Sequence, residues 1–149
     1  MFKRIIRKVA VLGSGVMGSR IACHFAGTGV QVLLLDVEAK QAADALAAAV
    51  KSNPSPAYTK NALRLISTGS FSEQMPEIKN HDWVIEVVVE RLDIKQQIFS
   101  EVEKYRKAGS LVTSNTSGIP IHLMAEGRSD DFKKHFCGTH FFNPPRYLR

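Results

Sequence analysis

Residues 13–18 combine glycines at a spacing that suits the binding of a phosphate group. Gly13, Gly15 and Gly18 follow the apolar run 9–12 at the spacing G-x-G-x-x-G and lead into a helical pattern. In this context the first glycine permits a tight turn, the second lets backbone approach a pyrophosphate, and the third lets the helix pack close to the strand. The N–H groups and the dipole of the helix then favour a bound phosphate. We expect a dinucleotide to bind at Gly13, Ser14, Gly15, Val16, Met17 and Gly18.

A carboxylate, Asp36, ends the second apolar run, residues 32–35, eighteen residues beyond Gly18. At that distance a carboxylate can accept hydrogen bonds from both hydroxyls of a ribose, and its charge would repel a 2′-phosphate. NAD is therefore favoured over NADP as the cofactor. Glycines often mark ordinary turns, so the motif alone is weak, but the strand, the helix and Asp36 supply the context that it requires.

His140 has the setting, among the five histidines, that most suggests catalysis. A neutral imidazole beside a nicotinamide could remove a hydroxyl proton while hydride leaves the same carbon. Ser117 and Asn115, in a polar loop, could donate hydrogen bonds to a substrate oxygen or to the nicotinamide carboxamide. Each has a simpler alternative, because a histidine on an apolar strand is more often a core residue and Ser or Asn before a helix is commonly a cap.

Glu90 and Lys95 lie five residues apart near the predicted start of a helix. The simplest interpretation is that the acidic residue complements the helix dipole and the lysine is solvated. The residues alone therefore assign these two side chains no role in binding.

The elements that position these residues alternate between strands and helices. We expect strands at 9–12, 32–35, 64–67, 83–89, 111–113 and 135–142, and helices at 16–26, 38–51, about 94–105 and 120–125. This order predicts an α/β fold, a doubly wound and mostly parallel sheet of the Rossmann type. Ligands bind such sheets beyond the carboxyl ends of the strands, so we expect the glycine loop, Asp36, Glu90, residues 114–117 and His140 to share one crevice.

The composition is that of a globular domain that binds small anionic molecules. The chain has 149 residues, 44% hydrophobic and 23% charged, and a net charge of +6, which suits a dinucleotide or coenzyme A. Nucleic acid is disfavoured as a partner because the basic residues crowd the two ends without interleaved aromatics, namely Lys3, Arg4, Arg7, Lys8, Arg146 and Arg149.

The cysteine content and the hydropathy pattern bear on where the protein works. Cys23 and Cys137 are far apart and have no metal-site spacing, which predicts neither a disulfide framework nor a bound metal and fits a cytoplasmic setting. The sequence has no signal-peptide core and no apolar stretch of about 18 residues, so we expect no contact with a membrane.

Four motifs together resemble one known family. They are residues 13–18, the run Val87-Val88-Val89-Glu90 with Lys95, the loop Ser114-Asn115-Thr116-Ser117, and His140-Phe141-Phe142-Asn143-Pro144. In order and context the sequence resembles the L-3-hydroxyacyl-CoA dehydrogenases over nearly its whole length. It looks most like bacterial multifunctional β-oxidation proteins in which an enoyl-CoA hydratase-like region follows this dehydrogenase.

The resemblance implies specific roles for the polar residues. It implies that His140 is the general base, that Ser117 contacts substrate and cofactor, and that Glu90 and Lys95 line the region of the nicotinamide ribose. Hydride would pass from C3 of a 3-hydroxyacyl-CoA to NAD and leave a 3-ketoacyl-CoA.

The sequence also departs from the family. Arg20 stands where many members have a small residue, and segment 51–67 is shorter than the helical arm that contacts coenzyme A in the family. In the family, a glutamate that orients the histidine and a helical domain for substrate binding and dimerisation follow beyond the position of Arg149.

We therefore expect residues 1–149 to be the NAD-binding domain of a longer homo-oligomeric enzyme, able to bind NAD but poor at turning over acyl-CoA. Two alternatives stay open. One is a non-catalytic NAD-binding module, and the other is a dehydrogenase of a small 3-hydroxy acid without coenzyme A.

Overall fold

The computed structural model describes residues 4–147, so that Lys3 and Arg149 of the predicted basic ends lie outside the described residues. Its centre is one parallel sheet formed by β1 (Lys8–Leu12), β2 (Gln31–Asp36), β3 (Ile66–Ser70), β4 (Trp83–Glu86), β5 (Leu111–Ser114) and β6 (Phe136–Gly138). The strand order is β3-β2-β1-β4-β5-β6, which is the order of the dinucleotide-binding doubly wound fold. The predicted fold class is confirmed.

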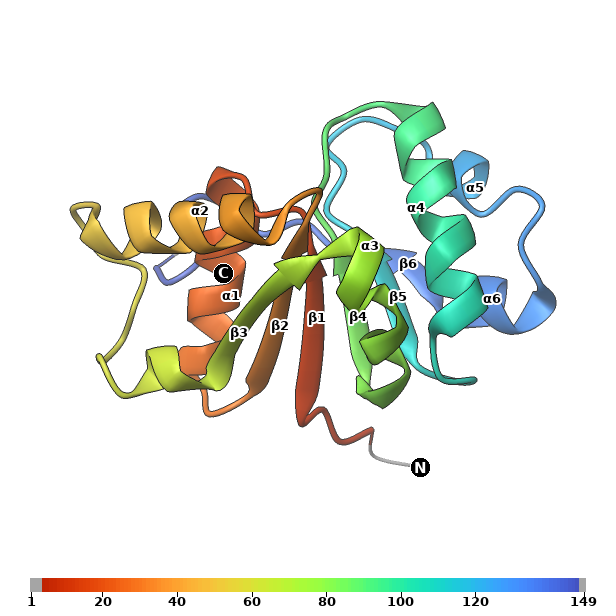
Figure 1. The fold of residues 1–149 in the computed structure, drawn as a ribbon. Helices are drawn as coiled ribbons and strands as arrows, with labels where there is room; N and C mark the ends of the chain where they lie inside the picture. The colour runs from red at the N-terminus through yellow and green to blue at the C-terminus, as the bar shows by residue number, and fades with distance from the viewer. Residues whose placement is uncertain (1–3, 148–149) are drawn as a thin grey trace.

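Helices cover both faces of the sheet (Figure 1). One layer holds α1 (Val16–Gly27) and α2 (Ala39–Lys51); the other holds α4 (Leu92–Tyr105), α5 (Ile121–Met124), α6 (Asp130–Lys134) and the 3₁₀ helix η2 (Met75–Asn80). A 3₁₀ turn, η1 (Ala62–Leu65), precedes β3, and α3 (Phe71–Gln74) follows it. The central strand β1 is buried on both sides, since Val9 and Val11 pack against α1 whereas Ala10 and Leu12 face α4, which explains its continuous apolar sequence.

The strands end at nearly the same level. Leu12 pairs with Leu35 of β2 and with Glu86 of β4. Glu86 pairs with Ser114 of β5, which in turn pairs with Gly138 of β6. The loops that follow these five strands therefore leave the sheet along one edge.

Three predicted strands differ from those of the structure by more than one residue at an end, and the other three by a single residue. The third begins at Ile66 rather than Arg64, because Arg64 belongs to η1, and runs on to Ser70 opposite Asp36. The fourth ends at Glu86 rather than Val89, because its partner β1 ends at Leu12 and no backbone remains to pair. The sixth covers 136–138 rather than 135–142, since β5 ends at Ser114.

The helix α6 was not predicted. Its start has a local cause, because the Ser129 hydroxyl accepts a hydrogen bond from the Phe132 N–H at 3.2 Å, and Asp130 and Asp131 occupy the first turn. Phe132 is buried and completes the core beneath α4.

Within residues 4–147, no helix is long and apolar enough to cross a lipid bilayer.

Candidate active site

The glycine loop has the geometry that its three predicted roles require. Gly13 has a φ of +104°, and its N–H donates to Leu35 O at 2.8 Å, which ties the turn to β2. A Cβ on Gly18 would lie 1.8 Å from Gly13 O, so only glycine permits this approach of helix to turn. A Cβ on Gly15 would meet nothing within 4 Å, so the space before the start of α1 is open to a ligand. The loop fits a pyrophosphate.

Asp36 lies at the end of β2 and is 8% exposed. Its Oδ2 accepts hydrogen bonds from Ser14 N at 2.6 Å and Ser14 Oγ at 2.5 Å, and its Oδ1 accepts one from Val37 N at 2.8 Å. The contact with Ser14, which the sequence did not predict, fixes the carboxylate beside the glycine loop. A carboxylate has about four acceptor positions, so one remains for a ribose hydroxyl.

A cavity of about 670 Å³ adjoins Asp36 and the glycine loop. Its walls are mainly apolar and include Val37, Phe71, Val88 and Ile98, which would suit the flat face of an adenine ring. Sequence reasoning missed this wall. The rule that ligands lie beyond strand ends would have found Phe71 if β3 had been predicted to end at Ser70.

Ser117 and His140 come together at the same edge of the sheet, beside pockets that share no lining residue with the cavity at Asp36. Ser117 Oγ lies 3.0 Å from His140 Nε2, within hydrogen-bond distance, and both residues are exposed. A pocket of about 360 Å³ borders both side chains, and a second of about 420 Å³ lies against His140, Phe141 and Phe142. An imidazole in contact with a hydroxyl, accessible from two pockets, can exchange a proton with a bound substrate.

Lys95 is buried rather than solvated, so the simplest sequence-based interpretation of this residue is wrong. It is 1% exposed, and its Nζ lies 2.6 Å from Glu86 Oε1 and 3.3 Å from Glu90 Oε2. Glu86 was not predicted as a site residue, although a carboxylate inside an apolar strand was a signal, because a buried charge requires a partner.

Glu90 binds the loop that carries Ser117. Its Oε1 accepts hydrogen bonds from Thr116 Oγ1, from Ser117 N at 3.1 Å and from Gly118 N at 3.2 Å. Partial burial opposes ionisation, but the bonds from Thr116 and Gly118 and the Lys95 charge outweigh it and lower the pKa of Glu90 to about 2.

The remaining predicted residues lie around the same edge. Asn115 Oδ1 accepts a hydrogen bond from Phe141 N at 2.8 Å, so Asn115 joins the loops after β5 and β6 and keeps only its amide hydrogens for a ligand. Val16 is 64% exposed at the start of α1, whereas Met17 packs against the core. Arg20 donates to Asn143 Oδ1 at 2.9 Å, so this departure from the family links α1 to the loop that follows β6.

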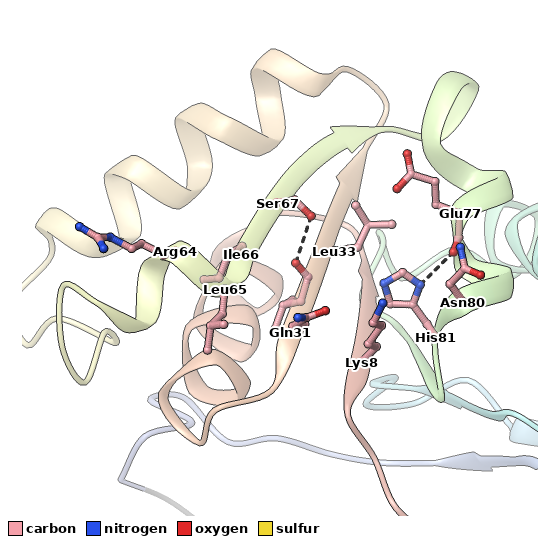
Figure 2. Close-up of a pocket in the computed structure, with 11 residues that line it drawn as sticks. Lys8, Gln31, Leu33, Arg64, Leu65, Ile66, Ser67, Glu77, Asn80 and His81 are labelled. Atoms are coloured by element: carbon pink, nitrogen blue, oxygen red, sulfur yellow. Dashed lines mark hydrogen bonds between the residues drawn. The ribbon is translucent and has the colours of Figure 1, made fainter.

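A separate pocket of about 320 Å³ lies at the amino ends of the strands, away from every predicted site residue (Figure 2). His81 borders it and hydrogen-bonds through Nδ1 to Glu77 O at 3.0 Å. Burial, assisted by the charge of Lys8, lowers the pKa of His81. The bond to Glu77 within η2 and the distance from the predicted site residues are those of a structural histidine.

The geometry at the carboxyl edge agrees with comparisons with known proteins. The family model described as the NAD binding domain of 3-hydroxyacyl-CoA dehydrogenase matches residues 8–149. The chain belongs to this family. NAD, the predicted cofactor, is the cofactor of the 3-hydroxyacyl-CoA dehydrogenase NAD-binding domain.

Curated relatives and solved structures carry related names. The chain is 47% identical over 165 residues to a probable 3-hydroxyacyl-CoA dehydrogenase of Bacillus subtilis, covering 97% of the chain and 21% of that protein. It is 43% identical over 150 residues to one of Deinococcus radiodurans, covering 96% and 43%. The crystal structure of 3-hydroxybutyryl-CoA dehydrogenase from Escherichia coli matches with a TM-score of 0.79 and 30% identity over 96% of the chain and 31% of that protein. The chain thus spans less than half the length of these relatives.

Proposed function

We propose that this chain is the NAD-binding domain of an enzyme that oxidises L-3-hydroxyacyl-CoA to 3-ketoacyl-CoA in fatty-acid β-oxidation. The observation that carries the proposal is the contact of Ser117 Oγ with His140 Nε2, at 3.0 Å, on the same edge of the sheet as the glycine loop and Asp36. The names of the relatives support the substrate class.

In this proposal His140 is the general base and Ser117 orients the substrate. The hydroxyl on C3 of the substrate lies within reach of both side chains, and His140 Nε2 accepts its proton. Bound NAD supplies the acceptor for the hydride that leaves C3. The Ser117 hydroxyl, released from the imidazole, donates to the substrate oxygen as that oxygen becomes a carbonyl.

Other residues in the crevice hold the cofactor. The glycine loop binds the pyrophosphate, Asp36 accepts a hydrogen bond from the adenosine ribose, and Glu90, held by the buried Lys95, borders the nicotinamide ribose. Asn115 has free amide hydrogens for the carboxamide. The charge of Asp36 makes NAD the favoured dinucleotide.

The proposal extends to the larger protein. Because the chain spans 21% and 43% of two relatives, we place the coenzyme A contacts and the carboxylate that orients His140 outside residues 1–149. The chain alone should then bind NAD and oxidise acyl-CoA slowly. The full-length protein would act in the cytoplasm as a homo-oligomer.

The test is NAD reduction by the full-length protein with 3-hydroxybutyryl-CoA and, separately, with free 3-hydroxybutyrate. We expect turnover of the thioester and a loss of about a thousandfold in kcat for His140→Ala, because general acid–base catalysis typically contributes 10²–10⁴. His122→Ala, at an exposed position on α5, is the matched control.

Turnover of the free acid instead would identify a dehydrogenase of small 3-hydroxy acids. NADH binding without turnover of either compound would identify a non-catalytic module.

A further inference from the structure

A buried ion pair, Glu86 and Lys95, lies at the carboxyl end of β4, and its other polar partners are Val88, Glu90 and Ser114. Glu86 is 0% exposed and Lys95 is 1% exposed, with Lys95 Nζ 2.6 Å from Glu86 Oε1. Such a pair is weak support for a fold, because removing two charges from water costs about as much as their attraction returns. Its position therefore requires a further explanation.

Glu86 accepts hydrogen bonds from the segment after β4 and from the neighbouring strand β5. Its Oε1 accepts a hydrogen bond from Val88 N at 2.7 Å, in the segment that follows β4. Its Oε2 accepts one from Ser114 Oγ at the end of β5. One buried carboxylate thus contacts both the segment that follows β4 and the last residue of β5.

Lys95 extends these contacts to the loop 115–118, which carries Ser117. Its Nζ lies 3.3 Å from Glu90 Oε2, while Glu90 Oε1 accepts the N–H groups of Ser117 and Gly118. Ser117 in turn contacts His140. An unbroken series of polar contacts connects the buried pair to the candidate base.

We propose that Glu86 and Lys95 act as a pair of positioning residues that fix Glu90 and the loop 115–118, and thereby set Ser117 against His140. This inference rests on the proposed function for its catalytic meaning. Glu86 and Ser114 are both 0% exposed, so neither side chain can touch a bound ligand. Glu86 therefore acts only through other residues.

The double variant E86Q K95M separates positioning from stability. In E86Q alone a buried ammonium loses its main partner, so the variant should unfold more easily than wild type. In E86Q K95M no buried charge is left unpaired, so thermal stability should recover toward wild type. If the pair also positions the loop, the loop should remain loose in the double variant.

Amide hydrogen exchange of the 149-residue chain measures the loop directly. In E86Q K95M we expect the Ser117 and Gly118 amides to exchange about tenfold faster relative to the Val11 amide of β1. We also expect the Kd for NADH to rise about tenfold. Each change corresponds to the loss of about one charge-assisted hydrogen bond. The matched control is R106M D131N, which removes an ion pair at the far end of α4. This control should change thermal stability without changing the exchange of the Ser117 and Gly118 amides relative to Val11, and without changing the Kd for NADH.

A milder variant covers the case in which the double variant does not fold. Ser114→Ala removes one hydroxyl from Glu86 Oε2 and should still raise the exchange of the Ser117 amide by about twofold. If E86Q K95M folds and its Ser117 and Gly118 amides exchange as in wild type, the proposal is overturned. If E86Q K95M does not fold, wild-type exchange of these amides in Ser114→Ala overturns it. If the loop amides respond as expected but wild-type chain binds no NADH, the positioning role stands and the proposed function fails.

Discussion

Ser117 Oγ and His140 Nε2 lie 3.0 Å apart although the two residues are 23 positions apart in the sequence. The contact follows from the register of two neighbouring parallel strands, since Ser114 of β5 pairs with Gly138 of β6. Ser117 lies three residues beyond the end of its strand and His140 two beyond the end of its own. The fold itself thus brings a hydroxyl and an imidazole together at the edge where the glycine loop also lies.

Two glycines in one motif should respond differently to the same substitution. Gly18→Ala places a Cβ against the carbonyl of Gly13, so we expect the free energy of unfolding to fall by about 3 kcal/mol. Gly15→Ala meets no protein atom within 4 Å, so its effect on unfolding should stay within about 0.5 kcal/mol while NADH binds about tenfold more weakly. Urea unfolding and NADH titration of both variants provide the comparison. Equal destabilisation by the two substitutions would contradict the assigned roles.

Glu90 should make the stability depend on pH in the acid range. Its pKa is about 2 in the folded chain, below the ordinary 4.5, so its stabilising effect is complete above pH 4.5 and is lost as the pH falls toward 2. The side chain is 46% exposed, and solvent screening limits the effect to less than about 1 kcal/mol.

The measurement is the difference in free energy of unfolding between wild type and Glu90→Gln at pH 6.5, 4.5 and 3.5 (roughly from above the titration into its upper half). We expect this difference to shrink at the lowest pH. Glu126→Gln, which removes one exposed carboxylate, controls for the general effect of charge. A difference that does not change with pH would show that ionised Glu90 does not hold the loop.

The sequence was sufficient for the parts of the site that depend on local patterns. Alternation of apolar runs with helical segments predicts a parallel sheet, and residues at or after the carboxyl ends of its strands then lie along one edge, as Asp36 and His140 do. Strand lengths were less predictable, because β4 and β6 end where their neighbours end rather than where their own apolar residues end.

The partner of a buried charge could not be predicted in the same way. Lys95 meets Glu86 only because the first turn of α4 packs over the end of β4, which depends on how the helix is oriented on the sheet. The link from Ser14 to Asp36 is similar, since it depends on the level at which β1 and β2 end. Both contacts require the tertiary arrangement.

The most direct test of the central claim is a fluorescence titration of the 149-residue chain with NADH and with NADPH, for wild type, Asp36→Ala and the exposed control Asp44→Ala on α2. We expect wild type and the control to bind NADH at least about tenfold more tightly than NADPH, because the Asp36 carboxylate repels a 2′-phosphate. Asp36→Ala should lose most of that preference. Equal binding of the two nucleotides by wild type, or no binding of either, would contradict the assignment of residues 8–36 as an NAD site.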